Sequence, residues 1–158
     1  MATEALDPLD RLIAERECER LIIEFVRRLD LGDPGDVAEL FTADGVWEWA
    51  EGDRRVQGRE ALRSYFGSRP ADRLSRRICT NILVTLTSGS TATATTYFTT
   101  YRVDGHTDGM EPPRPPTQVG HYEDTFHKSD GRWLLCTRST FLAFAGPTER
   151  LGPPAATS

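Results

Sequence analysis

Asp30 is the residue whose position in this sequence points most clearly to chemistry. It lies near the end of an amphipathic stretch, residues 14–33, in which apolar residues recur every three or four positions and predict a packed helix. On a helical wheel Asp30 falls between Ile23 and Val26, on the apolar flank. A carboxylate there could act as a general base in a pocket, or it could belong to a solvated helix exit at residues 31–34.

Arg138 is a second residue that needs an explanation, because its predicted strand face is weakly polar. Alternation places it beside Leu134 and Cys136. A buried guanidinium requires a carboxylate partner, and Asp30 and Asp124 are the two acids we expect to be within reach. Such a pair could fix the sheet, or Arg138 could contact a substrate.

His121 is the one histidine in the interior of a predicted strand, so it could transfer protons if it faces inward. His106 and Asp108, with His121 or His127, formally satisfy a two-histidine, one-carboxylate iron pattern. We do not predict a metal site from it, because the first pair lies in a glycine-rich loop with no strand to hold its geometry. No phosphate-binding loop, nucleophile elbow or zinc spacing occurs, and no cofactor is predicted.

The composition is that of one soluble globular domain of 158 residues. A net charge of −5 argues against nucleic acid or an anionic membrane as a partner, since both require a basic surface. The three cysteines, Cys18, Cys79 and Cys136, are widely spaced within apolar patterns, which is typical of buried thiols in a reducing compartment. No secretion signal or membrane span is recognisable, so we expect a cytoplasmic protein.

The chain reads as helices followed by long strands. After the first helix the pattern predicts a short helix from Asp33–Pro34 to Phe41, a turn at 42–45, a hairpin over 46–57 and a third helix over 58–67. Four long strands forming two hairpins are then predicted at 77–87, 91–103, 118–128 and 133–144.

Three segments fall outside this regular pattern. Residues 104–116 contain four prolines and read as an irregular loop or lid. Residues 1–8 are expected to be a flexible N-terminus, and residues 146–158 are too poor in apolar side chains to pack, so we expect a disordered tail. Residues 9–145 then form a single domain.

This order of elements predicts an α+β fold, in which a curved, mixed or antiparallel sheet wraps around the long first helix and two shorter helices. Such a sheet forms a cone with an open mouth. The aromatic residues are core residues by default, but some must line the cone, which would suit an apolar or ring-containing substrate. The candidates are Trp47, Trp49, Tyr65, Tyr97, Phe98 and Tyr101.

Several local patterns, in order, resemble the SnoaL-like branch of the nuclear-transport-factor-2-like superfamily. They are FVRRLDLGD (25–33), LFTADGV (40–46), GREAL (58–62), Thr80–Asn81, GHYED (120–124), and Gly131-Arg132-Trp133 followed by Arg138. The resemblance covers about Leu9 to Phe144 and implies a cone-shaped α+β barrel, often dimeric. Its members include dehydratases, isomerases, cyclases and dehydrohalogenases, and relatives in fold include non-catalytic oxygenase subunits.

The resemblance also implies site residues. Asp30 matches the acid of the lyase-type members, but their paired histidine is Arg77 here, and a frequent tyrosine is Phe25. Both differences remove proton-transfer groups. What remains is Asp30 as a base, Arg77 to hold an anion or polarise a carbonyl, and Asn81 to hydrogen-bond substrate.

Together these observations predict a cofactor-independent lyase, isomerase or cyclase that removes a proton next to a carbonyl. The predicted catalytic residues are Asp30, Arg77 and His121, and the predicted substrate-binding residues are Phe25, Trp47, Trp49, Tyr65, Asn81, Tyr97, Tyr101 and Arg138. The alternative is a non-catalytic subunit or ligand-binding protein on the same fold.

A homodimer formed through the sheet is also predicted. Simple alternation places Ile78, Ile82, Val84 and Leu86 on one face of their strand and assigns the opposite face, with Arg77, to the pocket. Both faces of this strand therefore need to be covered, and we expect one of them to contact a second copy of the chain.

Overall fold

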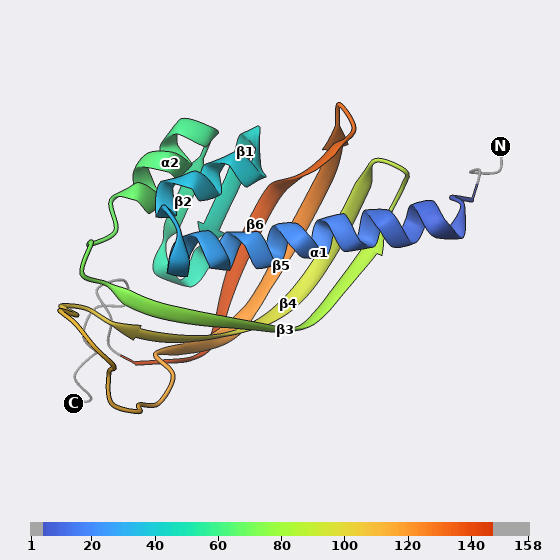
Figure 1. The fold of residues 1–158 in the computed structure, drawn as a ribbon. Coiled ribbons are helices and arrows are strands. Elements are labelled where there is room, and N and C mark those ends of the chain that lie inside the picture. Colours follow the sequence, from blue (N-terminus) through green and yellow to red (C-terminus); the bar gives the residue numbers. More distant parts are fainter. Residues whose placement is uncertain (1–4, 147–158) are drawn as a thin grey trace.

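A computed structural model describes residues 5–146, and it confirms the predicted α+β architecture (Figure 1). The helical elements are α1 (Pro8–Leu31), η1 (Pro34–Leu40), η2 (Ala50–Gly52) and α2 (Arg59–Gly67), of which η1 and η2 are 3-10 helices. The strands are β1 (Phe41–Trp49), β2 (Arg54–Gln57), β3 (Leu74–Leu86), β4 (Thr91–Val103), β5 (Gln118–Ser129) and β6 (Arg132–Ala145). Residues 147–158 of the predicted tail and residues 1–4 of the predicted flexible N-terminus lie outside the described residues. Within 5–8 the prediction is wrong, because Asp7 caps α1 and Pro8 begins it.

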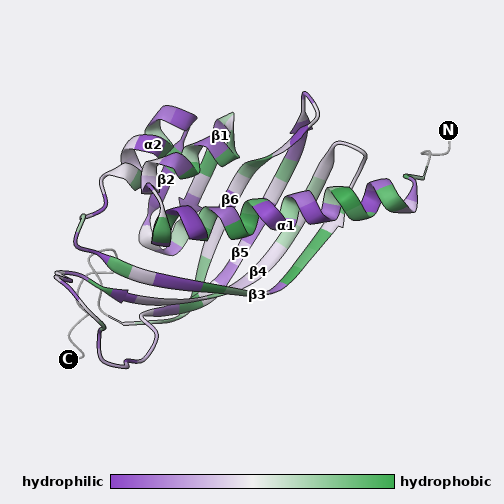
Figure 2. Cartoon of the chain, viewed as in Figure 1, coloured by the Kyte–Doolittle hydropathy of each residue, from purple (hydrophilic) through white to green (hydrophobic). Residues whose placement is uncertain are grey.

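Helix α1 is longer than predicted, because its start signal precedes the periodic stretch. The Asp7 carboxylate accepts a hydrogen bond from the Leu9 backbone N–H at 2.7 Å, and Pro8 occupies the first turn. The helix therefore begins at Pro8 and not at Ala14. Its apolar stripe is buried against the sheet, whereas the rest of the helix carries polar residues together with exposed apolar ones such as Leu12, Ile13 and Ile23, so that Figure 2 shows both purple and green along α1. No helix among the described residues is long and apolar enough to cross a membrane.

The six strands form one open sheet in the order β2-β1-β6-β5-β4-β3, in which only the β1–β6 pair is parallel. Both α-helices lie on one face of the sheet, which we call the inner face (Figure 1). The opposite face is the outer face. The prediction of a turn at 42–45 is wrong, because these residues belong to β1, whose pairing with β6 is irregular between Phe41 and Val46.

A β-bulge in β3 decides which of its residues face inward. Pairing with β4 breaks between Thr80 and Leu83, and Asn81 takes a left-handed conformation with φ of 53°. Before the bulge Ser75 and Arg77 point inward, whereas after it the even-numbered Ile82, Val84 and Leu86 do so. Ile78 and Ile82, predicted on the same face, therefore lie on opposite faces.

A second irregularity, in β6, gives a similar correction for Arg138. The pairing with β5 shifts between Thr125 and Phe126, so one extra residue of β6 is accommodated near Cys136. Arg138 consequently shares the inner face with buried Trp133 and Leu135 rather than with Leu134 and Cys136. The core lies between this inner face and α1, with η1 and α2 closing one end.

Candidate active site

Asp30 and Arg77 form an ion pair between the last turn of α1 and the start of β3. One Asp30 oxygen accepts hydrogen bonds from the Arg77 Nη1 at 2.5 Å and the Ser75 hydroxyl at 2.8 Å, and the other accepts from the Arg77 backbone N–H at 2.6 Å. The side chains are only 6% and 10% exposed, respectively. Asp30 is therefore not a solvated exit residue, and its carboxylate is held by three donors.

Arg77 lines a small cavity inside the cone. The cavity has a volume of about 40 Å³. That is room for about two or three water molecules. Its walls are Phe25, Leu29, Trp47, Phe66, Arg69, Arg77, Phe98, Thr100, Gln118, Tyr122 and Thr140. Aromatic side chains thus fill most of the cone, and polar groups occupy one part of its lining.

The polar lining carries more positive than negative charge. Arg69 donates to the Leu29 carbonyl and to the Ser75 hydroxyl, each at 3.2 Å, so it stands beside the Asp30–Arg77 pair. Two guanidinium groups therefore face one carboxylate at this wall. In addition, the buried hydroxyls of Thr100 and Thr140 have no hydrogen-bond partner within residues 5–146. The arrangement favours a small ligand with a partial or full negative charge.

Arg138 lies behind this cavity in a fully buried pair with Asp124, as the sequence suggested. Its Nε and Nη2 donate to the two Asp124 oxygens at 2.8 and 2.7 Å, and both side chains are 0% exposed. Burial alone would lower the pKa of Arg138, but the Asp124 charge and hydrogen bonds raise it. The guanidinium is sandwiched between the rings of Phe25 and Tyr122, 4.3 and 4.2 Å from their centres. Arg138 thus positions two rings of the cavity wall and is not among its lining residues.

Tyr122 is the phenol of the cavity wall. Burial raises its pKa to about 12, against the opposing charge of Arg138. The hydroxyl therefore stays protonated at neutral pH and can donate a hydrogen bond, but it is no base.

Among the residues predicted for the site, Phe25, Trp47 and Arg77 line the cavity, and Asp30 is bonded to its edge. Tyr65 packs against the Trp47 ring at 5.2 Å, one layer further out. Trp49 is buried, and its indole N–H donates to Glu51 at 3.1 Å, so it serves the core and not the cavity lining.

The structure places four other predicted site residues away from the cavity. His121 lies on the outer face, stacked on Phe141 at 4.9 Å, so it cannot stand in for the missing histidine. Tyr97, paired with His121 and 57% exposed, and Tyr101 point to the same outer face. Asn81 is exposed at the β3 bulge.

Phe98, one of the aromatic candidates for the cone, does line the cavity, but sequence reasoning missed Thr100 on the same strand. Phe98 and Thr100 alternate with Tyr97 and Tyr101, and the strand pattern alone does not tell which set faces inward. Ser75 could have been found, because it precedes Arg77 by two positions and so shares its strand face. Nothing in the described part of the chain gathers three histidine, cysteine or acidic side chains closely enough to hold a metal ion.

Solved structures of other proteins have the same fold. A candidate scytalone dehydratase from Novosphingobium aromaticivorans superposes with a TM-score of 0.73 at 20% identity, over 94% of this chain and 98% of its own. A hexachlorocyclohexane dehydrochlorinase, LinA type 2, gives 0.71 at 17% identity over 94% and 99%. ActVI-ORFA from Streptomyces coelicolor gives 0.68 at 21% identity over 84% and 97%.

These likenesses establish the nuclear-transport-factor-2-like fold and not a reaction, since all three identities are low. No curated protein sequence is similar enough to count as a relative. A family model, however, matches residues 10–139, which include most of the first helix and most of the sheet. The chain belongs to the SnoaL-like domain family.

Proposed function

We propose that the chain is a cofactor-independent enzyme of lyase, isomerase or cyclase type, whose chemistry takes place at the Asp30–Arg77 pair. The observation that carries this proposal is that Arg77 lines the cavity and its guanidinium also holds the Asp30 carboxylate at the cavity edge. A fixed cation in a largely apolar cavity can stabilise negative charge that develops on a substrate oxygen. The same contact controls the carboxylate that would remove the proton.

The proposed reaction begins with an exchange of partners. A substrate carbonyl oxygen takes the place of Asp30 on Arg77 Nη1, while Asp30 keeps its bonds to Ser75 and to the Arg77 backbone N–H. The freed carboxylate lone pair accepts a proton from the carbon next to the carbonyl, and the C–H electron pair moves into an enolate held by Arg77. The enolate then expels a leaving group with its electron pair, or is reprotonated at another carbon.

Substrate size is limited by the aromatic wall. The cavity of about 40 Å³ admits only a few non-hydrogen atoms beside Arg77. A ring-containing substrate therefore enters only when side chains such as Phe66 or Phe98 change position. A compound in which a slim carbonyl end leads a larger apolar body fits this geometry better than one that must be enclosed entirely.

The test is Asp30→Asn, which keeps the shape of the side chain and removes the base. Turnover of a substrate found by screening small carbonyl compounds should fall about 100-fold. Asp44→Asn, at an exposed carboxylate on β1, is the matched control and should leave turnover unchanged. Activity of Asp30→Asn within about threefold of the parent would exclude Asp30 as the base.

A non-catalytic ligand-binding protein or subunit is the second candidate, and one observation favours it. Both Asp30 oxygens are already engaged by donors from the chain itself, so the carboxylate is not free in the resting protein. On this alternative, small carbonyl compounds bind with Arg77-dependent affinity, are recovered unchanged, and bind equally well to Asp30→Asn.

We further propose that the chain forms a homodimer through the outer face. The supporting observation is an exposed row of rings across three strands, in which Tyr97 pairs with His121 and His121 pairs with Phe141. Ile78 and Phe144, in the neighbouring row, are 51% and 72% exposed. We call these five residues the outer apolar patch. Apolar and aromatic side chains gathered on one face of a sheet suit contact with a second copy of the same face.

A further inference from the structure

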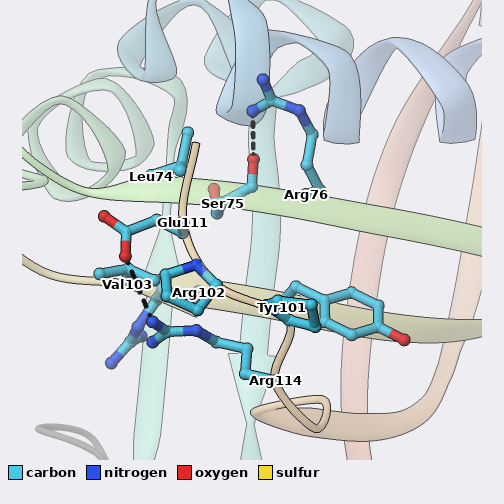
Figure 3. A pocket seen from close by; sticks show the side chains of 10 residues that line it. Leu74, Ser75, Arg76, Tyr101, Arg102, Val103, Glu111 and Arg114 are labelled. Carbon is cyan, nitrogen blue, oxygen red and sulfur yellow. Dashed lines mark hydrogen bonds and ion pairs between the residues drawn. The ribbon is translucent and has the colours of Figure 1, made fainter. Parts of the chain in front are cut away.

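A larger pocket lies on the outer face of the sheet, away from the Asp30–Arg77 pair. The loop between β4 and β5 crosses the beginning of β3 and the end of β4, and encloses a volume of about 410 Å³ (Figure 3). That volume falls within the range of small-molecule sites. Loop residues Glu111 to Arg114 form one wall, and Leu74, Tyr101 and Val103 form the floor.

The loop that builds this pocket is fixed at both ends. His106 N–H donates to the Asp72 carbonyl at 2.9 Å, and Thr117 N–H donates to the Thr100 carbonyl at 2.7 Å. Within the loop, the His106 ring contacts Glu111 at 2.7 Å, and Arg114 contacts the same carboxylate at 3.3 Å. The loop is therefore a bound strap rather than a free lid.

The pocket combines an apolar surface with excess positive charge. Tyr101, Pro112 and Pro113 contribute flat surfaces, whereas the charged lining residues are three arginines and a single acid, Glu111. This excess occurs in a chain whose net charge is −5. A positive pocket on an acidic protein favours an anion over a neutral or cationic ligand.

Arg76 is the arginine of this pocket that retains a charge for a ligand. Arg114 pairs with Glu111, and Arg102 lies 3.5 Å from Asp104. Arg76, in contrast, is exposed and donates to the uncharged carbonyl of Ser75 at 2.7 Å (Figure 3). In Figure 3 its side chain extends from β3 toward the helices, so it must turn toward the loop to bind a ligand lying between Tyr101 and the prolines. Across residues 5–146 it has no carboxylate within 4.0 Å.

We propose that this pocket binds a small aromatic carboxylate, with the ring between Tyr101 and the Pro112–Pro113 wall and the carboxylate on Arg76. A guanidinium matches a carboxylate in a two-pronged hydrogen bond, and prolines and tyrosine offer rigid surfaces for a flat ring. The site is separated from the inner cavity by the sheet, and it stands whether or not the Asp30–Arg77 pair is catalytic.

The test is calorimetric titration of the full chain with 2-naphthoate and with its uncharged analogue 2-naphthamide. Naphthoate should bind saturably, and naphthamide at least about tenfold more weakly. Arg76→Gln should weaken naphthoate binding about five- to tenfold, as expected for one lost charge-assisted contact. The matched control is Arg54→Gln, which removes an exposed arginine from β2 and should leave the affinity unchanged.

Two further measurements locate the ligand. Tyr101→Ala should weaken naphthoate binding, and the backbone amide resonances of Glu111 and Arg114, on either side of the two prolines, should shift on titration. The proposal is overturned if naphthoate shows no saturation at millimolar concentration, or if naphthoate and naphthamide bind equally. It is also overturned if Arg77→His abolishes binding while Arg76→Gln does not, because the ligand would then occupy the inner cavity.

Discussion

The inner cavity and the outer pocket lie on opposite sides of β3, and each depends on one of two consecutive arginines. Arg77 points inward, where it is 10% exposed and tied to Asp30, beside a cavity of about 40 Å³. Arg76 lies on the other face of the strand, at a pocket of about 410 Å³, and within residues 5–146 its guanidinium donates to a carbonyl oxygen and pairs with no carboxylate. A buried cation must be paired with a carboxylate, whereas an exposed cation is solvated by water and remains available to a ligand. The two residues are of the same type, so their different roles follow from the face of β3 on which each side chain lies.

The largest expected effect comes from changing the two arginines in the same way. Arg77→Leu leaves the 6% exposed Asp30 carboxylate without its cation, and should lower the free energy of unfolding by about 3 kcal/mol, because breaking a buried pair costs roughly 3–5 kcal/mol and two donors remain. Arg76→Leu should change it by less than about 0.5 kcal/mol. Urea unfolding of both variants measures the difference, and equal values would show that the facing assigned to β3 is wrong.

Arg77→His sharpens the same comparison at the level of binding. It introduces the histidine that the resemblance to lyase-type SnoaL-like proteins implies for this place, and keeps a hydrogen-bond donor near Asp30. If Arg77 holds a substrate anion, the variant should raise KM severalfold, with folding nearly intact. An unchanged KM would remove the anion-holding role.

The fold was predictable because most signals in this chain are local. The long helix, the two hairpins and their order follow from periodicity and turn residues, and β4 begins and ends at the predicted residues. The two bulges were not predictable, because a single asparagine or cysteine within a strand pattern does not mark an irregularity and the strands are apolar on both sides. These bulges reverse the facing of Ile82 and of Leu134, which is why the sequence misassigned residues to the pocket and to the opposite face.

The outer pocket could not be predicted for a different reason. Its strap is held by long-range contacts, such as those between Arg73 and Asp104 and between His106 and Asp72. Proline content shows only that residues 104–116 are neither helix nor strand. That the loop folds back over β3 depends on partners some 30 residues earlier in the chain.

The next effect concerns the outer apolar patch. Tyr97→Glu or Ile78→Glu places a charge in the proposed dimer contact and should weaken dimerisation at least about 100-fold, roughly 2.7 kcal/mol. Leu12→Glu, at a 62% exposed position on α1, is the control. Sedimentation should give twice the 17.7 kDa chain mass for the parent and for the control. A parent that sediments as a single 17.7 kDa species at micromolar concentration would contradict the dimer.

A smaller effect, of opposite sign, is expected inside the cone. The Thr96 hydroxyl is fully buried and has no partner within the described residues, and the residue does not line the cavity. Thr96→Val replaces an unsatisfied hydroxyl by a methyl group of similar size and should stabilise the protein by about 1 kcal/mol. On the outer face, Thr125→Val loses a 2.7 Å bond to Thr137 at an exposed site and should change stability by less than about 0.5 kcal/mol. Loss of stability in Thr96→Val, measured by urea unfolding, would show that this hydroxyl is satisfied.

The smallest effect concerns Asp104, which anchors the strap of the outer pocket. Burial would raise its pKa, but a 2.6 Å hydrogen bond from Arg73 and the charges of Arg102, Arg73 and Arg69 together lower it below the ordinary 3.8. A carboxyl whose pKa is lowered by folding stabilises the protein above its unfolded pKa, and loses that contribution as the pH falls through the folded value. The side chain is 37% exposed, so solvent screening keeps the contribution below about 1 kcal/mol.

Asp104→Asn should therefore be slightly less stable than the parent at pH 7, and this difference in the free energy of unfolding should close below pH 3.8. Asp108→Asn, in the same loop, changes an exposed carboxylate that accepts a hydrogen bond from the Gly109 N–H, and should show no such gap. Urea unfolding at pH 7 and pH 3 measures both, and a gap that is equal at the two pH values would show that the Arg73–Asp104 contact does not hold the strap.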